Sequence, residues 1–214
     1  MTLLTIPGYT QTDSNITQEI SGSFGILGPG ERDIPSTTTY TEMQPGFYTT
    51  ANYTFSFGFA GLSTTYFYHI NKIHASDVID RNNLSSITSD PYQAFGMLIG
   101  PQFSISLNKE KNNSYLFFGL QAGGFIATLP DQRYEYSETE YTEYLKSKAP
   151  GFVFSYLVGY KLKCTEKISI AVSFEPTWEN ASIYIRHFGT VSGSDNYNWE
   201  YVYPAIKFSL INNL

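Results

Sequence analysis

The 214-residue chain has little of what stabilises most secreted or soluble domains. Its single cysteine, Cys164, excludes an internal disulfide and a metal site built from several thiolates. Charged residues make up 15% of the chain, whereas soluble domains average roughly 25%. No stretch approaches the roughly 18 consecutive apolar residues of a membrane-spanning helix. The net charge of −6 leaves no basic stripe for phosphates, which argues against a nucleic-acid partner.

Aromatic residues, in contrast, are abundant. The chain holds 18 Tyr and 16 Phe, and flat side chains of this kind favour β-strands because they pack well on a pleated surface. The mean hydropathy of −0.21 is typical of a soluble protein. A β-barrel in a membrane, however, exposes only alternate residues to lipid, so hydropathy does not reveal it.

Alternation of apolar with small or polar residues predicts about eight strands, since successive side chains of a strand point to opposite faces. In 168–178, for example, Ile170, Val172 and Phe174 share one face and Ala171 and Ser173 the other. The predicted strands are 18–28, 46–58, 62–72, 93–107, 114–128, 152–163, 168–178 and 199–211.

The connections between these segments are alternately short and long. The short ones are 59–61, 108–113 and 164–167, and the long polar ones are 29–45, 74–91, 130–150 and 179–198. In an up-and-down antiparallel barrel every second connection lies at the same end, so all the short turns fall together. This asymmetry is typical of bacterial outer-membrane barrels, with short periplasmic turns and long extracellular loops. We therefore expect an all-β, eight-stranded antiparallel transmembrane β-barrel over 16–214, after a periplasmic tail at 1–15.

A water-soluble, lipocalin-like ligand carrier has the same periodicity and is the first alternative. The polar face here is rich in Gly, Ala and Ser, which suits a narrow lumen better than a surface in water. Trp178 and Trp199 fall near the outer strand ends, where aromatic girdles of membrane barrels lie. Because the first residues lack the features of a signal peptide, we expect the numbering to begin on a mature chain in the outer membrane of a Gram-negative bacterium.

Several short motifs resemble the small outer-membrane barrels of the OmpX/OmpA type, particularly the "outer membrane protein beta-barrel" group of Bacteroidota. They are Gly100-Pro-Gln-Phe-Ser104, Gly119-Leu-Gln-Ala-Gly-Gly124, Gly159-Tyr-Lys-Leu162 and Ile168-Ser-Ile-Ala-Val-Ser-Phe-Glu175. The chain ends in Leu214, where many such barrels end in an aromatic residue. The resemblance implies location and fold, with roles that range over adhesion, envelope integrity and service in larger complexes.

Charges on the small-residue face predict a polar network inside the barrel. Buried charges must be paired because unpaired burial is costly, so we expect a hydrogen-bonded filling of the lumen, with a proton or ion path as the alternative. The predicted network comprises Lys161, Glu175, Lys207, His69, Gln102, Gln121, Tyr201 and Tyr203.

The loop 130–150 interleaves acidic and tyrosine residues, in an alternation that suggests strands extending beyond the membrane. Tyr offers a large contact area at low entropic cost, so we expect a partner to bind here, through Tyr134, Tyr136, Glu138, Glu140, Tyr141, Glu143 and Tyr144. A plain solvated hairpin is the alternative. The expected partners are outer-membrane lipid or lipopolysaccharide, and a protein partner either at the extracellular loops or within a larger outer-membrane complex.

Catalysis is not expected. A lipid A-modifying hydrolase would need a His, a Ser and a carboxylate together on the lipid face, whereas His69 is predicted inside and His74 and His187 in outer loops. The aspartates Asp77, Asp80, Asp90 and Asp195 match no calcium loop, so we expect neither a metal nor a cofactor. The sequence therefore predicts a structural or binding protein, with the hydrolase and an accessory subunit of a larger complex as alternatives.

Overall fold

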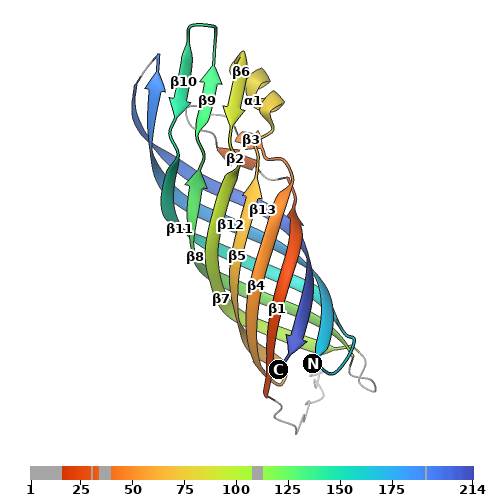
Figure 1. The fold of residues 1–214 in the computed structure, drawn as a ribbon. Helices are drawn as coiled ribbons and strands as arrows, with labels where there is room; N and C mark the ends of the chain where they lie inside the picture. The colour runs from red at the N-terminus through yellow and green to blue at the C-terminus, as the bar shows by residue number, and fades with distance from the viewer. Residues whose placement is uncertain (1–15, 30, 34–39, 108–112, 191) are drawn as a thin grey trace, which may run out of the picture.

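The fold is a closed ring of eight antiparallel strands. The computed structural model describes residues 16–29, 31–33, 40–107, 113–190 and 192–214, so the tail predicted at 1–15 lies outside the described residues. The ring strands are β1 (Ile16–Leu27), β4 (Gly46–Phe57), β5 (Ala60–Asn71), β7 (Tyr92–Ser106), β8 (Ser114–Leu129), β11 (Ser147–Lys163), β12 (Ile168–Gly189) and β13 (Gly193–Asn213). Each pairs with the next, and β13 pairs with β1 to close the ring (Figure 1). The predicted barrel is confirmed.

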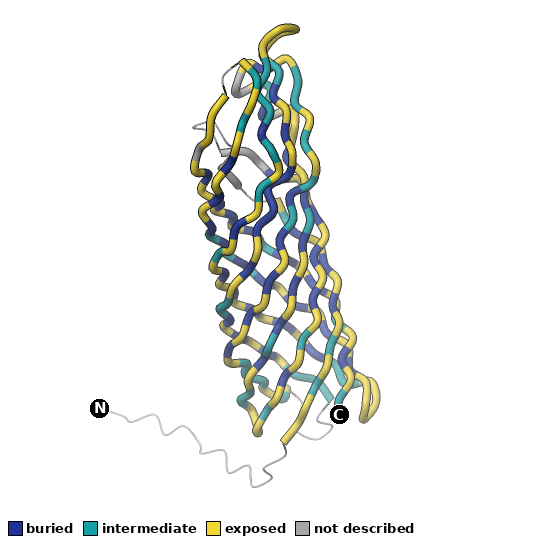
Figure 2. Tube along the Cα trace, turned by 60° about the vertical axis from the view of Figure 1, so that its left-hand side comes forward, coloured by how far each residue is buried: buried dark blue, intermediate teal, exposed yellow. Residues whose placement is uncertain are grey.

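The apolar faces of the strands point outward. Exposed and buried positions alternate along the ring strands (Figure 2). The exposed positions hold apolar side chains such as Phe24, Phe95 and Leu210, whereas many inward neighbours, such as Ser23 and Gly96, are small or polar. A soluble carrier barrel would have the opposite orientation. No charged residue faces outward between 168 and 178 of β12 or between 202 and 212 of β13. We call this outward surface the apolar belt. It needs a lipid bilayer around it.

The connections at one end of the barrel are tight. Gly58 and Phe59 join β4 to β5, and Gly58 has a φ of 60°, a left-handed conformation that glycine adopts without steric cost. Between β11 and β12, the backbone N–H groups of Cys164 and Thr165 donate to the carbonyl of Ile168 at 2.9 and 3.0 Å. The C-terminus lies at this same end (Figure 1).

The outer end carries additional structure in three of the four predicted loops. Its elements are β2 (Glu31–Asp33), β3 (Tyr40–Glu42), α1 (Ala75–Asn82), β6 (Ser86–Ser89), β9 (Gln132–Glu135) and β10 (Tyr141–Tyr144). The fourth prediction, a long loop over 179–198, is wrong. There β12 continues to Gly189 and β13 begins at Gly193, so the two strands pair without interruption well above the belt. We call β6, β9, β10 and the upper parts of β12 and β13 the outer extension.

The alternation of buried and exposed positions along β12 continues unchanged into the outer extension, but the face that carries the apolar residues changes there. Up to Trp178, apolar residues of β12 face outward. Above it, Ala181, Ile183 and Ile185 face inward and are buried, while polar Asn180 and Ser182 face outward. Because water surrounds the strands above the membrane, apolar residues there occupy the inward-facing positions and polar residues the outward-facing ones. This change of face near Trp178 marks the upper edge of the apolar belt.

The described helix, α1, lies at the outer end and spans eight residues. Its Val78 is fully buried, and Leu84 just after it is also buried in the same core as Tyr134. In the described part of the chain, no helix is long and apolar enough to cross a membrane.

Close backbone approach within the barrel makes Gly123 a sensitive position. It lies on β8 opposite Leu98 of β7, and an added Cβ would collide with the Met97 carbonyl and lie 3.0 Å from the Leu98 Cα. We expect Gly123→Ala to lower the free energy of unfolding by about 1–3 kcal/mol, as overpacking does. Urea titration in detergent micelles measures this. Gly22→Ala is the control because nothing lies within 4 Å of its added Cβ; equal losses in both variants would contradict the prediction.

Candidate functional site

The centre of the lumen is organised around the carboxylate of Glu179, on β12. This side chain is fully buried and accepts three hydrogen bonds from two other strands of the barrel. His69 Nε2 of β5 donates to Oε1 at 2.8 Å, Tyr203 Oη of β13 donates to the same oxygen at 2.9 Å, and Trp199 Nε1 donates to Oε2 at 3.1 Å. A carboxylate with this many donors binds opposite walls of the barrel together.

A second buried carboxylate, that of Glu175, lies four residues before Glu179 on the same strand and closer to the periplasmic end of the lumen. Glu175 of β12 is fully buried and is paired with Lys207 of β13, while Tyr48 Oη of β4 donates to its Oε1 at 3.0 Å. The Lys207 ammonium also lies 5.6 Å from the centre of the Tyr48 ring. Charge pairing and hydrogen bonding together compensate the desolvation of both ions.

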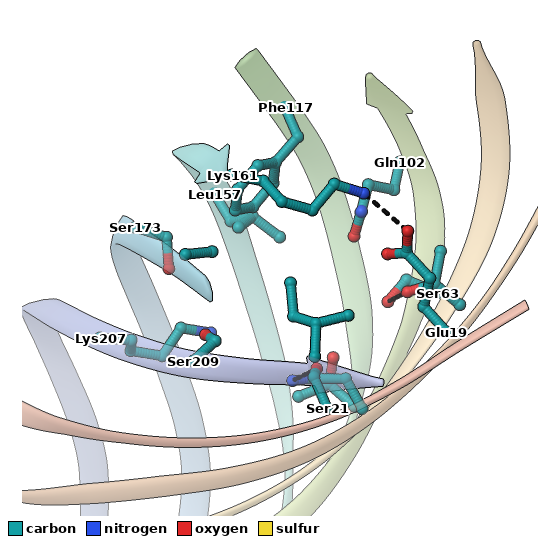
Figure 3. Close-up of a pocket in the computed structure, with 15 residues that line it drawn as sticks. Glu19, Ser21, Ser63, Gln102, Phe117, Leu157, Lys161, Ser173, Lys207 and Ser209 are labelled. Carbon is teal, nitrogen blue, oxygen red and sulfur yellow. Dashed lines mark hydrogen bonds and ion pairs between the residues drawn. The ribbon is translucent and has the colours of Figure 1, made fainter. Parts of the chain in front are cut away.

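The periplasmic half of the lumen holds a small polar cavity of about 40 Å³, enough for a few water molecules. At its wall, Lys161 Nζ of β11 donates to Glu19 Oε1 of β1 at 2.6 Å (Figure 3). Their side chains are 10% and 15% exposed. Most other lining groups are hydroxyls and amides, from Ser21, Asn52, Thr54, Ser63, Thr65, Gln102, Ser173 and Ser209.

The predicted lumen residues all lie on the inner face, but at different levels. Lys161 and Gln102 line the cavity, Glu175 and Lys207 form the ion pair above it, and His69 and Tyr203 belong to the Glu179 group. Tyr201 Oη accepts from Asn71 Nδ2 at 2.5 Å, and Gln121 Oε1 accepts from Thr65 Oγ1 at 3.1 Å. Among the described residues, five buried polar atoms lack a partner: His69 Nδ1, Asn71 Oδ1, Gln121 Nε2, Ser155 Oγ and Thr177 Oγ1.

Sequence reasoning missed Glu179, Glu19 and Tyr48. Glu179 was assigned to a loop, although it shares the parity of Glu175 and continues the same inner face. Continuing the alternation of inward and outward positions beyond Trp178 identifies Glu179 as a lumen residue. Glu19 lies next to the start of the predicted first strand, and Tyr48 at an inward position of β4.

The prediction that Trp199 belongs to a membrane girdle is wrong. Its side chain is fully buried in the lumen, packed against Tyr92 and Phe125 with ring centres 6.0 and 6.2 Å away. It shares the inward parity of Tyr201 and Tyr203, which sets its direction. Trp178 does lie on the outer surface, half-buried. Its ring packs against Phe152 at 6.3 Å, and its Nε1 donates to Glu200 at 3.4 Å.

Large aromatic side chains fill the outer half of the lumen. Gln132 of β9 joins two of them, because its Nε2 donates to Tyr92 and its Oε1 accepts from Tyr134 Oη at 2.6 Å. The largest fully buried side chains are Trp199, Tyr48, Tyr92, Tyr134, Tyr144, Tyr201, Tyr203 and Phe67. An eight-stranded barrel is just wide enough for its interior to be filled in this way.

The prediction that Tyr134 and Tyr144 belong to a partner-binding surface is wrong. They are 1% and 2% exposed and pack edge to face with ring centres 5.4 Å apart. Strand alternation turns them inward. Burial raises the pKa of Tyr134 well above its usual value, so its phenol remains a hydrogen-bond donor.

The other predicted loop residues lie at or near the surface. β9 and β10 form a hairpin whose tip is held by hydrogen bonds from the Tyr136 and Ser137 N–H groups to the Glu140 carbonyl, at 2.9 and 3.3 Å. Tyr136, Glu138 and Glu140 at this tip are exposed, whereas Tyr141 and Glu143 are half-buried. Residues 136–140 are called the hairpin tip below.

The histidines outside the lumen are not arranged as a catalytic site on the lipid face. His74 Nδ1 lies 3.0 Å from Ser76 Oγ at the start of α1, and His187 packs on Tyr144 with ring centres 5.5 Å apart. Ser192 and Ser194 are exposed at the top of the β12–β13 hairpin. Across the described ranges, no three His, Cys, Asp or Glu side chains are grouped closely enough to hold a metal ion.

Comparison with known proteins finds similarity in structure. A scan of protein-family models gives no match, and neither does a search of curated protein sequences. Among solved structures, Neisserial surface protein A (NspA) aligns over 92% of this chain and 96% of its own, with a TM-score of 0.54 and 6% identity. The outer membrane protein OprG from Pseudomonas aeruginosa aligns over 94% and 97%, with a TM-score of 0.59 and 8% identity. The chain therefore has the fold of small outer-membrane barrels, and its apolar belt makes it an integral membrane β-barrel.

Proposed function

We propose that this barrel is a non-enzymatic binding protein whose filled lumen supports a rigid extension outside the cell. The outer extension, and the hairpin tip in particular, is the surface that binds a partner. Adhesion is the role that this arrangement serves best. Membership of the OmpX/OmpA type of Bacteroidota stays a prediction from the sequence motifs.

One observation carries the proposal: the outer extension is built of ordered, paired strands. β12 spans 22 residues, and about 9–11 tilted residues suffice to cross a bilayer. The remainder pairs with β13 on one side and, through Thr142↔Gly189 to Tyr144↔His187, with β10 on the other. Such a sheet presents its tip with little ordering cost on binding.

The hairpin tip is acidic and aromatic, so it suits a basic partner surface. Glu138, Glu140 and Tyr136 are exposed there. At its base, the Ser86 hydroxyl donates to Glu135 at 2.5 Å and Arg133 lies 3.0 Å from the same carboxylate. The Ser86 hydrogen bond, and then the Arg133 charge, lower the pKa of Glu135. Glu135 therefore stays ionised further into the acid range.

The test is retention of Gram-negative host cells on surfaces coated with extracellular-matrix protein. Cells that express the barrel should be retained several-fold more than cells without it. The variant Tyr136→Ser/Glu138→Gln/Glu140→Gln should fall to the level of cells without the barrel, because it removes the tip's charge and contact area but keeps its backbone hydrogen bonds. Surface amounts are matched by the heat-modifiable band on SDS gels.

Glu166→Gln is the control, since it removes an exposed acidic charge at the opposite, periplasmic end. It should leave retention unchanged. Equal retention with the tip variant would overturn the proposal. So would co-purification with a larger complex without any gain in retention, which would favour an accessory subunit. Single-channel steps in planar bilayers would contradict the filled lumen.

A further inference from the structure

The outward face of β12 carries two exposed aromatic side chains high in the outer extension. Tyr184 is 59% exposed and Phe188 is 49% exposed, and Arg186 between them is exposed as well. Lower on the same face, the outward positions above the belt hold polar Asn180 and Ser182. Aromatic residues and arginine are the types enriched in protein–protein interfaces. We call Tyr184, Arg186 and Phe188 the β12 stripe.

The stripe is held flat by strands on both sides. β10 lies on one side, where Glu143 is opposite Phe188, and β13 lies on the other, where Asn196 is opposite Tyr184. Alternate residues of a strand lie about 7 Å apart, so the stripe is about 14 Å long. Because the backbone beneath it is already paired, little conformational entropy is lost when a partner binds it.

The stripe offers a cation to an acidic partner. Among the residues that the structure describes, Arg186 takes part in no ion pair. Lys146 and Lys148, in the segment that follows β10, are also exposed. Of the acids nearby, Glu143 is half-buried, and Asp131 accepts a hydrogen bond from the Lys146 backbone N–H at 2.6 Å.

The hairpin tip has the complementary chemistry. Glu138, Glu140 and Tyr136 are exposed there, and residues 136–140 include no basic side chain. We propose that the hairpin tip of one copy of this protein binds the β12 stripe of a second copy. The tip's carboxylates then face Arg186, and the Tyr136 ring packs on the aromatic rings of the stripe. This inference rests on the proposed function, because it names the partner of the same tip.

The heights of the two surfaces place the second copy on another cell. The tip forms the outer extreme of the molecule (Figure 1). Phe188 is opposite Glu143, three residues from Glu140, so the tip begins about 10 Å beyond the stripe. Barrels side by side in one membrane stand at equal height, and their tips pass above each other's stripes.

A copy in an opposing membrane is inverted, and its tip runs down along the first copy's extension. A two-fold axis midway between the two membranes then brings each tip to the other copy's stripe. Such a pair is closed and makes the same contact twice. The expected activity is therefore the clustering of cells that carry the barrel.

Two-colour clustering of Gram-negative host cells tests this contact. One variant reverses the charge of the tip, Glu138→Lys/Glu140→Lys, and the other reverses that of the stripe, Arg186→Glu. Cells with either variant alone should form several-fold fewer clusters than cells with the unaltered barrel, because like charges then meet at both contacts. A mixture of the two variants should cluster again, with both colours in each cluster, since every tip then meets a stripe of opposite charge.

Lys167→Glu, at an exposed periplasmic turn, is the control and should leave clustering unchanged. The heat-modifiable band confirms equal amounts of folded protein. A mixture of the two variants that stays dispersed would overturn the proposal. So would equal clustering of barrel-bearing cells with cells that lack the barrel, since the partner would then be another surface molecule.

Retention on matrix protein separates this inference from the proposed function. Arg186→Glu cells should be retained as well as unaltered cells, because their tip is intact, yet they should not cluster. If the tip variant lost retention while Arg186→Glu cells still clustered, the proposed function would stand and this inference would be wrong. Mixed-colour clusters without any retention on matrix would support the contact between copies and contradict matrix binding.

Discussion

Replacing Glu179 by alanine should cost the barrel about 3–5 kcal/mol of unfolding free energy, because one partner of a buried charged network is removed. His69, Tyr203 and Trp199 each donate to this carboxylate from a buried position. Without it, three donors stay buried and unsatisfied, and each pays its own desolvation penalty. The measurement is urea unfolding in micelles, with the thermal midpoint of the heat-modifiable band as a second reading.

Glu200→Ala is the control for this prediction. Glu200 is exposed on the neighbouring strand, and among the described residues its side chain accepts one hydrogen bond, from Trp178 Nε1 at 3.4 Å. We expect a change within about 0.5 kcal/mol, as for most surface substitutions. A Glu179→Ala barrel within about 1 kcal/mol of the unaltered protein would show that the carboxylate does not organise the lumen.

The second large effect concerns the Lys207–Glu175 pair. Lys207→Met alone should lose about 3–5 kcal/mol, because it leaves the fully buried Glu175 without its counter-charge. Adding Glu175→Leu should recover most of that loss, since replacing both members of a buried pair by apolar groups is often neutral. A double-mutant cycle in the same urea assay gives the coupling energy directly.

Lys167→Met, at an exposed periplasmic turn, removes the same charge and should change stability little. If the double variant were as unstable as the sum of its single variants, the two side chains would not be coupled, and the proposed pairing would be wrong. If it were nearly as stable as the unaltered barrel, the pair would serve to fill and order the lumen more than to stabilise it.

The membrane-embedded strands were predictable because lipid imposes one simple rule on them. Where Ile170, Val172 and Phe174 face hydrocarbon, every second residue must be apolar, so parity alone gives both the strand and its lumen-facing side. Lys161, Glu175 and Lys207 follow from the same rule. The sequence does not show which of these charges pair with one another. The stagger between strands is fixed by pairings that are distant in sequence, such as Gly25↔Lys207.

Above the membrane that rule no longer holds. Asn180 and Ser182 face water, and polar residues at these positions are typical of a loop. The sequence therefore did not predict that β12 continues there, and it did not place Glu179 and Trp199 in the lumen. The same error placed Tyr134 and Tyr144 on the outside. A search for the point at which apolar parity switches sides would have found these residues, since Ala181, Ile183 and Ile185 alternate as regularly as the lipid-facing residues.

Because the contact between β1 and β13 closes the barrel, we expect this chain to fold in an all-or-none manner. Glu19 pairs with Asn213 and Leu27 with Ala205, so the seam joins the two most distant strands, and such high-contact-order pairings form slowly. Until they form, the facing edges of β1 and β13 present backbone donors and acceptors with no partner. Hydrocarbon does not tolerate such open edges. A chain shortened within its last strand would therefore lose the whole barrel, and cells must keep the unfinished chain away from both lipid and other sheet edges.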